Sequence, residues 1–444
     1  MDTFIGRRKV VEATCALGSL ALLDCMAKSV PAAAGGTAMS KPEELETRMA
    51  EHVERGELPG LVALVSRRGE VQVEVIGNKT AGAVDPIRRD TLFRIASMTK
   101  PITAAATMAL VEDGKLQLDE SIERLLPEMA NRRVLKKLDG ALDDTVPAAR
   151  SITVRDLLTF RMGFGIVFGP PDALPIQRAA NALRLGAFGP PRPLEPPPPD
   201  EWIRRFATLP LMHQPGERWM YNTGAEVLSV LLARAAGQPL DALLRDRIFG
   251  PLGMNDTSFA VPEPKLDRLA TSYMARDPFH PDAGGFDVYD PVRGGQWSRP
   301  PAFPSGGAGL VSTADDFLAF AQMLLGRGAV GRTRILSEAS VQAMTTDQLT
   351  REQKSESASS FTRGYWENHS WGFGLSIGTA PDELTAAAGR YGWDGGLGTS
   401  WSSDPARDLV GILMTQRAAF PPRASVYSDF WSAVYGRPAP MAPS

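Results

Sequence analysis

The chain has 444 residues, of which 43% are hydrophobic and 22% charged, and its formal net charge is -3. This composition is close to that of an average soluble globular protein, and the absence of a basic excess argues against binding to nucleic acid. At about 100–200 residues per domain, the length allows two to four domains or one large composite domain.

Cysteine and histidine content excludes several kinds of site. The two cysteines, Cys15 and Cys25, lie near the N-terminus, so the main body has no disulfide, no Cys-ligated zinc and no cysteine nucleophile. The four histidines are His52, His213, His280 and His369. They show neither HxH nor HExxH spacing, so we expect no histidine-built metal centre and no cofactor.

The N-terminal region has the three-part layout of an export signal. Residues 7–9 (RRK) are basic, residues 13–23 form an apolar run, and residues 32–34 supply small side chains for cleavage. The paired arginines indicate a twin-arginine signal. The apolar run is too short to cross about 30 Å of bilayer, so no stable membrane anchor is expected. We predict a signal peptide over residues 1–34 and a periplasmic or secreted protein, or a cytoplasmic one if the leader is not cleaved.

The next segments alternate between helix and strand patterns. Apolar residues at four-residue spacing predict a helix over residues 42–56. Residues 61–77 contain two β-branched, alternating runs around an Arg-Arg-Gly turn, which predicts a hairpin. An Ala-rich helix follows over residues 97–114, with Gly114 at its end.

The middle of the chain is rich in proline and helix patterns. Residues 130–215 are irregular, which predicts loops and short helices that cover another part of the molecule, or a linker. Residues 224–244 predict a helix interrupted at residues 237–239. A helix over residues 313–325 begins with Thr313 and Asp316 in the spacing of a capping box.

The C-terminal third returns to strand patterns at residues 371–378, 398–404 and 409–417. The order of strands, helices and strands predicts an α/β domain that contains an inserted helical region. We assign residues 41–114 and 300–440 to the α/β domain and residues 115–299 to the mainly helical insertion with its proline-rich loops.

One nucleophile motif can be rejected. Residues 374–378 match the G-x-S-x-G pattern of α/β-hydrolases, in which the catalytic histidine follows the serine in the chain. Here the last histidine, His369, precedes Ser376. The segment is also typical of a strand, and we therefore expect no catalytic role for it.

Ser97-Met98-Thr99-Lys100 is a stronger candidate. Residues three apart lie on the same face of a helical turn, and a serine hydroxyl becomes a good nucleophile when a nearby base takes its proton. A lysine acts as that base when burial lowers its pKa. Pro101 favours the first turn of a helix, which places Ser97 at or just before the helix start. Alone the pattern is weak, because an N-cap serine and a solvated lysine also produce it.

The surrounding sequence adds a family resemblance. Residues 93–103 (FRIASMTKPIT) resemble the nucleophile segment of the serine β-lactamase and penicillin-binding-protein superfamily, and most closely class C β-lactamases and family VIII carboxylesterases. Further segments resemble that family's landmarks in the same order and cover most of residues 41–420. They are residues 153–165, 215–232, 249–259, 305–325 and 392–405. The resemblance implies an α/β (α+β sandwich) fold of the β-lactamase/transpeptidase type, with an antiparallel sheet flanked by helices.

The resemblance also implies the catalytic residues. Ser97 matches the acylated nucleophile, Lys100 its partner base, and Tyr221 the tyrosine of the family's Y-x-N motif. A phenolate stabilised by a lysine and a helix N-terminus can accept the serine proton and later activate water. Without the matched segment, Tyr221 would be interpreted as a core aromatic residue.

The family's K-T-G motif is matched by Trp393-Asp394-Gly395, followed by Gly396. The resemblance implies that these residues contact the substrate and that the amides of Ser97 and Gly396 form an oxyanion hole. Loss of such a donor typically costs on the order of 10²–10³ in rate. A plain turn before a strand would use the same two glycines.

Departures from the family pattern bear on the substrate. Trp393 and Asp394 replace the lysine that attracts a carboxylate, so an anionic substrate loses an ion pair. Thr223 replaces the asparagine of Y-x-N, and we expect Asn222, one position earlier, to point elsewhere. Residues 160–162 (FRM) replace the family's His-Thr-Ser, and the sequence assigns no effect to this change.

The favoured hypothesis is a serine carboxylesterase that cleaves small neutral esters without metal or cofactor. The alternative is a β-lactamase or D-Ala-D-Ala carboxypeptidase with the same Ser/Lys/Tyr chemistry, in which Arg218 or Arg390 replaces the missing lysine. A catalytically silent penicillin-recognising protein is a third hypothesis, disfavoured because all three catalytic residues are present. Transfer of the acyl group to an alcohol or amine is also open. The natural ester and the oligomeric state do not follow from the sequence.

Overall fold

The structure is a computed structural model that describes residues 42–167, 172–186, 189–277, 285–357, 364–382, 384, 388–418 and 424–437. Residues 38–444 form one compact unit. The predicted signal peptide, residues 1–34, lies outside the described residues.

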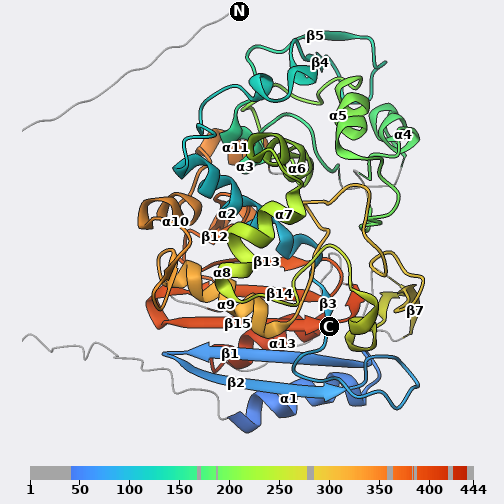
Figure 1. The fold of residues 1–444 in the computed structure, drawn as a ribbon, viewed down its shortest axis with the longest axis vertical. Coiled ribbons are helices and arrows are strands. Elements are labelled where there is room, and N and C mark those ends of the chain that lie inside the picture. The colour runs from blue at the N-terminus through green and yellow to red at the C-terminus, as the bar shows by residue number, and fades with distance from the viewer. Residues whose placement is uncertain are drawn as a thin grey trace, which may run out of the picture. The chain divides into compact units, whose positions relative to one another are not determined.

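A seven-stranded sheet is the centre of this unit (Figure 1). Its order is β11-β12-β13-β14-β15-β1-β2, and all neighbouring strands are antiparallel. The strands are β1 (Gly60–Arg67), β2 (Glu70–Gly77), β11 (His369–Trp371), β12 (Ser376–Gly378), β13 (Tyr391–Gly395), β14 (Thr399–Asp404) and β15 (Leu409–Thr415). The chain thus makes one edge of the sheet first and completes it about 300 residues later, which confirms the predicted antiparallel sheet flanked by helices.

Period-two alternation assigns the faces of the sheet. Leu61 and Ala63 on β1 pack into the cluster that includes α1 (Pro42–Glu54) and α13 (Ser425–Val434). Val62 and Leu64 pack on the opposite side, in the main core. On that side α9 (Ala314–Leu325) contacts β15 and β1.

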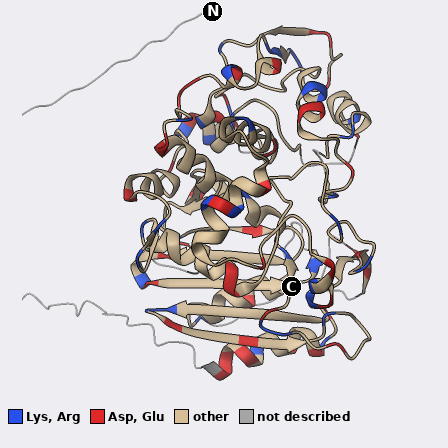
Figure 2. Cartoon of the chain, in the orientation of Figure 1, with Lys and Arg blue, Asp and Glu red and all other residues tan. Residues whose placement is uncertain are grey.

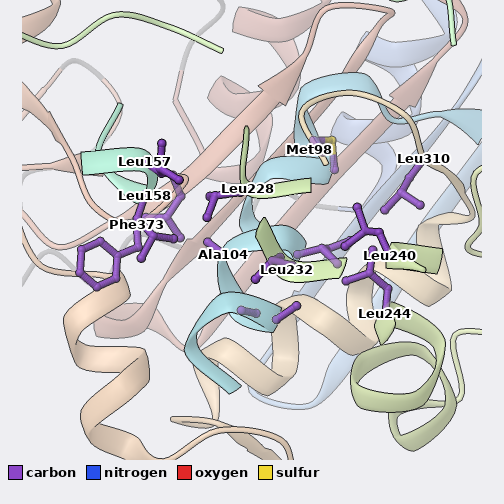
Figure 3. Packing of buried hydrophobic residues seen from close by; sticks show 14 of the residues in the cluster. Met98, Ala104, Leu157, Leu158, Leu228, Leu232, Leu240, Leu244, Leu310 and Phe373 are labelled. Carbon is purple, nitrogen blue, oxygen red and sulfur yellow. The ribbon is translucent and has the colours of Figure 1, made fainter. Parts of the chain in front are cut away.

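The main core lies between the sheet and the helices above it. Ala104 on α2 (Thr99–Glu112) lies beside Leu228 and Leu232 on α6 (Thr223–Ala236), as Figure 3 shows. The predicted break follows α6, where Gly237 adopts φ 69° and Pro239 precedes α7 (Leu240–Leu244). Both α2 and α6 are buried over most of their length. Their N-terminal ends, and the residues just before them, are therefore held in place.

Residues 115–299 supply helices and short strands between α2 and α9. Its helices are α3 (Val154–Leu158), α4 (Pro175–Ala182), α5 (Pro199–Ala207), α6, α7 and α8 (Gly250–Leu252), and a π-type turn covers Arg245–Phe249. Its strands are β4 (Arg133–Leu135), β5 (Thr145–Pro147), β6 (Ser272–Ala275) and β7 (Phe286–Asp290). The other short elements are β3 (Phe93–Arg94), β8 (Val311–Ser312), β9 (Ala329–Val330), β10 (Thr333–Arg334), β16 (Arg417–Ala418), α10 (Glu338–Met344), α11 (Arg351–Glu356) and α12 (Tyr365–Asn368).

Two local predictions are corrected. Residues 371–378 are a hairpin rather than one strand, because Gly374 adopts φ 74° in a turn that joins β11 to β12. The capping box at α9 is only half formed, since Thr313 accepts a hydrogen bond from the Asp316 amide. The Asp316 carboxylate instead accepts bonds from the amide of Asp256 and the hydroxyl of Thr257.

A buried ion cluster joins the first and last helices. His52 on α1 lies 2.5 Å from Glu57 through Nδ1 and 2.9 Å from Asp429 of α13 through Nε2. Burial by itself lowers the pKa of His52, but the hydrogen bonds and charges of the two carboxylates outweigh it and raise the pKa above its usual value.

Charges of both signs are interspersed over the described chain, and most strand positions of the large sheet are uncharged (Figure 2). No single helix in the described ranges has the length and apolar character to cross a bilayer. The segments Thr223–Ala236 and Leu240–Leu252 reach that length together, but as a pair bent by 78°.

Candidate active site

Ser97 lies in a 3₁₀ turn, Ala96–Met98, between β3 and the start of α2. Ala96 has a φ of 41°, a left-handed conformation that costs a non-glycine residue on the order of 1–2 kcal/mol. A Cβ on Gly395 of β13 would overlap the carbonyl oxygen of Ile95, so glycine is needed where the sheet meets this turn. Ser97 is therefore held on a strained turn at a fixed position against the sheet.

Lys100 is fully buried on the first turn of α2. Its Nζ donates hydrogen bonds to Ser97 Oγ at 2.9 Å and to the carbonyl of Gly307 at 2.7 Å. Burial lowers the pKa of Lys100 to about 7, and the charge of Glu226 opposes this shift. Near neutral pH a large fraction of Lys100 is thus unprotonated and able to take the Ser97 proton.

Tyr221 completes the group that the sequence predicted. The Nζ of Lys100 lies 4.5 Å from the centre of its ring, and its hydroxyl accepts a 2.7 Å hydrogen bond from Trp393 Nε1. Burial raises the pKa of Tyr221, while hydrogen bonds with Ser97 and Trp393 lower it in part. Because burial raises this pKa and lowers that of Lys100, Lys100 is the better proton acceptor and Tyr221 a protonated phenol that can relay a proton.

An aromatic cluster surrounds the phenol. The ring of Phe160 packs edge to face on the ring of Tyr221, with 5.8 Å between the ring centres. It also packs on Trp371, with 5.1 Å between the ring centres. The ring centre of Trp393 lies 4.6 Å from that of Trp371 and 5.6 Å from that of Tyr221. The departure at residues 160–162, to which the sequence assigned no effect, therefore places an apolar ring against Tyr221.

Glu226 is a site residue that the sequence analysis missed. It lies on α6 and is 5% exposed, and its Oε1 accepts a 2.8 Å hydrogen bond from Ser305. Burial raises the pKa of Glu226, and its interactions with Ser305 and Lys100 lower it in part. The available signal was a carboxylate on a helix whose other neighbouring residues are mostly apolar.

Successive residues of β13 point to opposite faces of the sheet. Trp393 reaches Tyr221, whereas Asp394 Oδ1 accepts a 2.6 Å hydrogen bond from Ser400. That hydroxyl in turn accepts a hydrogen bond from Trp431 Nε1 of α13, on the other side of the sheet. This placement corrects the predicted substrate contact of Asp394, since its side chain faces away from Trp393.

A cavity of about 90 Å³ brings Ser97, Tyr221 and Gly396 together. Asn222 also lines this cavity, contrary to the expectation that it points elsewhere, because its φ of 81° turns the chain just before α6. Thr223 is buried, and its hydroxyl has no hydrogen-bond partner among the residues that the structure describes. The proline-rich segment covers the cavity, as predicted, with Leu185, Gly186, Gly189, Pro191, Arg192, Pro193 and Pro196.

The two arginines considered as replacements for the family's lysine lie elsewhere. Arg218 pairs with Glu217 and Glu356, and Arg390 pairs with Asp382 at 2.5 Å. Neither residue lines the cavity. Arg192 of the proline-rich segment lines it instead. Among the residues that the structure describes, no group of three or more His, Cys, Asp or Glu side chains is arranged to hold a metal ion.

Known proteins of similar sequence and fold span most of this chain. Protein Rv1367c of Mycobacterium tuberculosis (strain ATCC 25618 / H37Rv) is 39% identical over 400 residues, which cover 89% of this chain and 93% of that protein. Esterase EstB of Burkholderia gladioli is 32% identical over 406 residues, with coverage of 87% and 93%. The solved structure of EstCE1, a hydrolase with promiscuous acyltransferase activity, matches with a TM-score of 0.70 at 24% identity over 89% of this chain and 98% of that chain.

The likeness to EstCE1 shows the fold, and the relatives of higher identity show common descent over nearly the whole chain. Residues 45–430 match the family described as Beta-lactamase. The resemblance seen in the sequence is confirmed, and the chain belongs to the beta-lactamase family of hydrolases.

Proposed function

We propose that this protein is a serine carboxylesterase that hydrolyses neutral esters through an acyl-enzyme on Ser97. The observation that carries the proposal is the contact of half-buried Ser97 with buried Lys100, with 2.9 Å between Oγ and Nζ and a lysine pKa of about 7. A hydroxyl next to an unprotonated amine in a water-poor site is an activated nucleophile. The similarity to Esterase EstB supports ester hydrolysis as the reaction.

In the acylation step, Ser97 Oγ attacks the ester carbonyl carbon while its proton passes to Lys100 Nζ. The carbonyl electrons move to oxygen, and the amides of Ser97 and Gly396, which line the same cavity, donate hydrogen bonds to this oxyanion. As the tetrahedral intermediate collapses, the C–O bond to the alcohol breaks. The alkoxide takes a proton from Tyr221, which is recharged from Lys100.

Deacylation runs the same relay in reverse. Water gives a proton to the Lys100 and Tyr221 pair as its oxygen attacks the acyl carbon, and the proton returns to Ser97 Oγ when the acid leaves. Trp393 stabilises the charge that Tyr221 carries during each transfer, because its Nε1–H points at the phenolic oxygen. Acceptance of the acyl group by an alcohol instead of water would use the same steps, and the description of EstCE1 supports testing it.

A β-lactamase or D-Ala-D-Ala carboxypeptidase is the second candidate function. It is favoured by Arg192, which lines the cavity and offers a cation for a substrate carboxylate. Arg192 also pairs with Glu195 at 3.2 Å, which offsets much of its charge. The neutral ester therefore remains the preferred substrate class.

Turnover of short p-nitrophenyl esters and of a chromogenic cephalosporin, for wild type and Ser97→Ala, tests the two candidates. Ester turnover that is lost in Ser97→Ala, with little cephalosporin turnover, is the expected result. Dominant cephalosporin turnover would favour the second candidate. Ester turnover that survives the substitution would exclude Ser97 from the mechanism.

Export remains part of this proposal, because the leader lies outside the described residues. We propose that the mature protein begins near Ala34 and is periplasmic or secreted. Mass spectrometry of the mature chain tests this, and an N-terminus at Met1 or Asp2 would contradict it.

A further inference from the structure

The turn at residues 305–309 supplies a second hydrogen-bond partner for Lys100. Lys100 Nζ donates to the carbonyl of Gly307 at 2.7 Å, besides its 2.9 Å contact with Ser97 Oγ. A carbonyl oxygen only accepts hydrogen bonds, so it engages an N–H of Lys100 whether the amine is protonated or not. The position of the Gly307 carbonyl therefore decides where Nζ lies relative to Ser97 Oγ.

The hydroxyl of Ser305 sets the direction of that carbonyl. Ser305 Oγ accepts hydrogen bonds from the amides of Gly307 at 3.2 Å and Ala308 at 3.0 Å, a pattern that serine side chains use to stabilise turns. The amide of Ala308 and the carbonyl of Gly307 belong to one planar peptide unit and point in opposite directions. Because Ser305 holds the amide end of this unit, the carbonyl end is directed at Lys100.

Ser305 is itself held by Glu226 of α6. Its hydroxyl donates a 2.8 Å hydrogen bond to Oε1 of this buried carboxylate. A Cβ on Gly307 would overlap the same Oε1, so glycine is needed for the turn to approach α6 this closely. The Ser305 hydroxyl thus connects α6 to the peptide unit that binds Lys100.

These three hydrogen bonds use the whole bonding capacity of the Ser305 hydroxyl. A hydroxyl has one donor position and two acceptor positions. Glu226 takes the donor, and the amides of Gly307 and Ala308 take both acceptors. Ser305 is half-buried and lines the cavity that Ser97 also lines. Its hydroxyl is nevertheless committed to the turn, with no position left for a substrate.

We propose that Ser305 is a positioning residue for the reaction at Ser97. Its hydroxyl directs the Gly307 carbonyl, and this carbonyl holds Lys100 Nζ where it takes the Ser97 proton. The inference rests on the proposed esterase function. Without the hydroxyl, the peptide unit between Gly307 and Ala308 loses its fixed plane and Lys100 its fixed position. Displacement of a reacting group by about 1 Å costs on the order of 10²-fold in rate.

The test compares wild type, Ser305→Ala, Ser305→Thr and Ser229→Ala. Ser229 is a matched control, because its buried hydroxyl accepts a 2.7 Å hydrogen bond from the amide of Gly306 in the same turn. That hydroxyl donates to the carbonyl of Ala225 rather than to Glu226. Stopped-flow kinetics with p-nitrophenyl acetate give the acylation rate constant and the substrate dissociation constant separately, and melting temperatures report folding. Rates are compared on the alkaline plateau of each variant, where a change in the pKa of Lys100 has little effect.

Ser305→Ala should lower the acylation rate constant on the order of 10²-fold and leave the dissociation constant within about twofold of wild type. Ser305→Thr, which keeps the hydroxyl, should restore most of the rate, and Ser229→Ala should lose far less than Ser305→Ala. If Ser305→Ala does not fold, Ser305→Cys replaces it. Its thiol is a weak donor and acceptor, so acylation should again slow at an unchanged dissociation constant.

Four results would overturn the inference and leave the esterase function in place. They are wild-type acylation in Ser305→Ala or Ser305→Cys, weaker substrate binding with an unchanged acylation rate, a folded Ser305→Thr as slow as Ser305→Ala, and an equal loss in Ser229→Ala. Absence of Ser97-dependent ester turnover in wild type would overturn both the inference and the proposed function.

Discussion

Replacement of Trp393 by phenylalanine should slow acyl transfer with little effect on folding. The substitution removes the 2.7 Å hydrogen bond from Nε1 to the Tyr221 oxygen but keeps an aromatic ring beside Trp371. That hydrogen bond counts most when Tyr221 has given its proton to the leaving alkoxide and carries negative charge. A hydrogen bond to a charged group contributes about 1.5–3 kcal/mol, so kcat should fall roughly 10- to 150-fold.

Trp371→Phe is the matched control within the same aromatic cluster. Trp371 is fully buried, and its Nε1 has no hydrogen-bond partner in the described part of the chain, so the same change of ring removes no bond there. We expect near wild-type kcat and an unchanged or higher melting temperature, because a buried unsatisfied N–H costs stability.

Stopped-flow measurement of the acylation burst with a p-nitrophenyl ester separates this effect from substrate binding. Trp393→Phe should reduce the burst rate with little change in KM, and it should raise the pKa of Tyr221 further because a hydrogen bond that lowers that pKa is lost. The reasoning is refuted if Trp393→Phe retains wild-type acylation, or if both variants lose the same amount.

Three further predictions concern pH and packing. Glu226→Gln should lower the pKa of Lys100, since the charge of Glu226 raises that pKa. In a plot of kcat/KM against pH, the acid limb should therefore move to lower pH. An acid limb that does not move would argue against coupling of the two groups. His52→Asn should lower the free energy of unfolding in urea more at mildly acidic pH than at about pH 9. The raised pKa of His52 stabilises the fold below about pH 6.5, and this stability is lost as His52 deprotonates through its folded-state pKa. A larger loss of stability at high pH would contradict this. Gly395→Ala should reduce kcat/KM on the order of 10²-fold, because the added Cβ would overlap the carbonyl of Ile95 and displace the turn that carries Ser97. Wild-type kinetics in a folded variant would show that the close approach of Gly395 to Ile95 is not needed.

The sequence by itself determined the local elements and the candidate nucleophile. Side-chain alternation specified the β1–β2 hairpin, and the spacing of Ser97 and Lys100 with Pro101 specified a serine at the start of a helix. These signals depend on neighbours within a few residues, where backbone geometry alone sets which side chains share a face. The ordered landmarks identified the family and its antiparallel sheet, both of which the comparisons and the fold confirm.

Only the tertiary structure decided how distant residues act on Ser97 and Lys100. The sequence could not show that Glu226 lies beside Lys100, that Trp393 donates to Tyr221, or that Phe303 lines the cavity of Ser97, because each relation joins elements separated by many residues. The pKa of Lys100 has the same origin, since it depends on how completely the surrounding helices and sheet exclude water. Local spacing and the ordered family landmarks thus identified the candidate reacting groups, and long-range packing set the pKa of Lys100 and the space around the site.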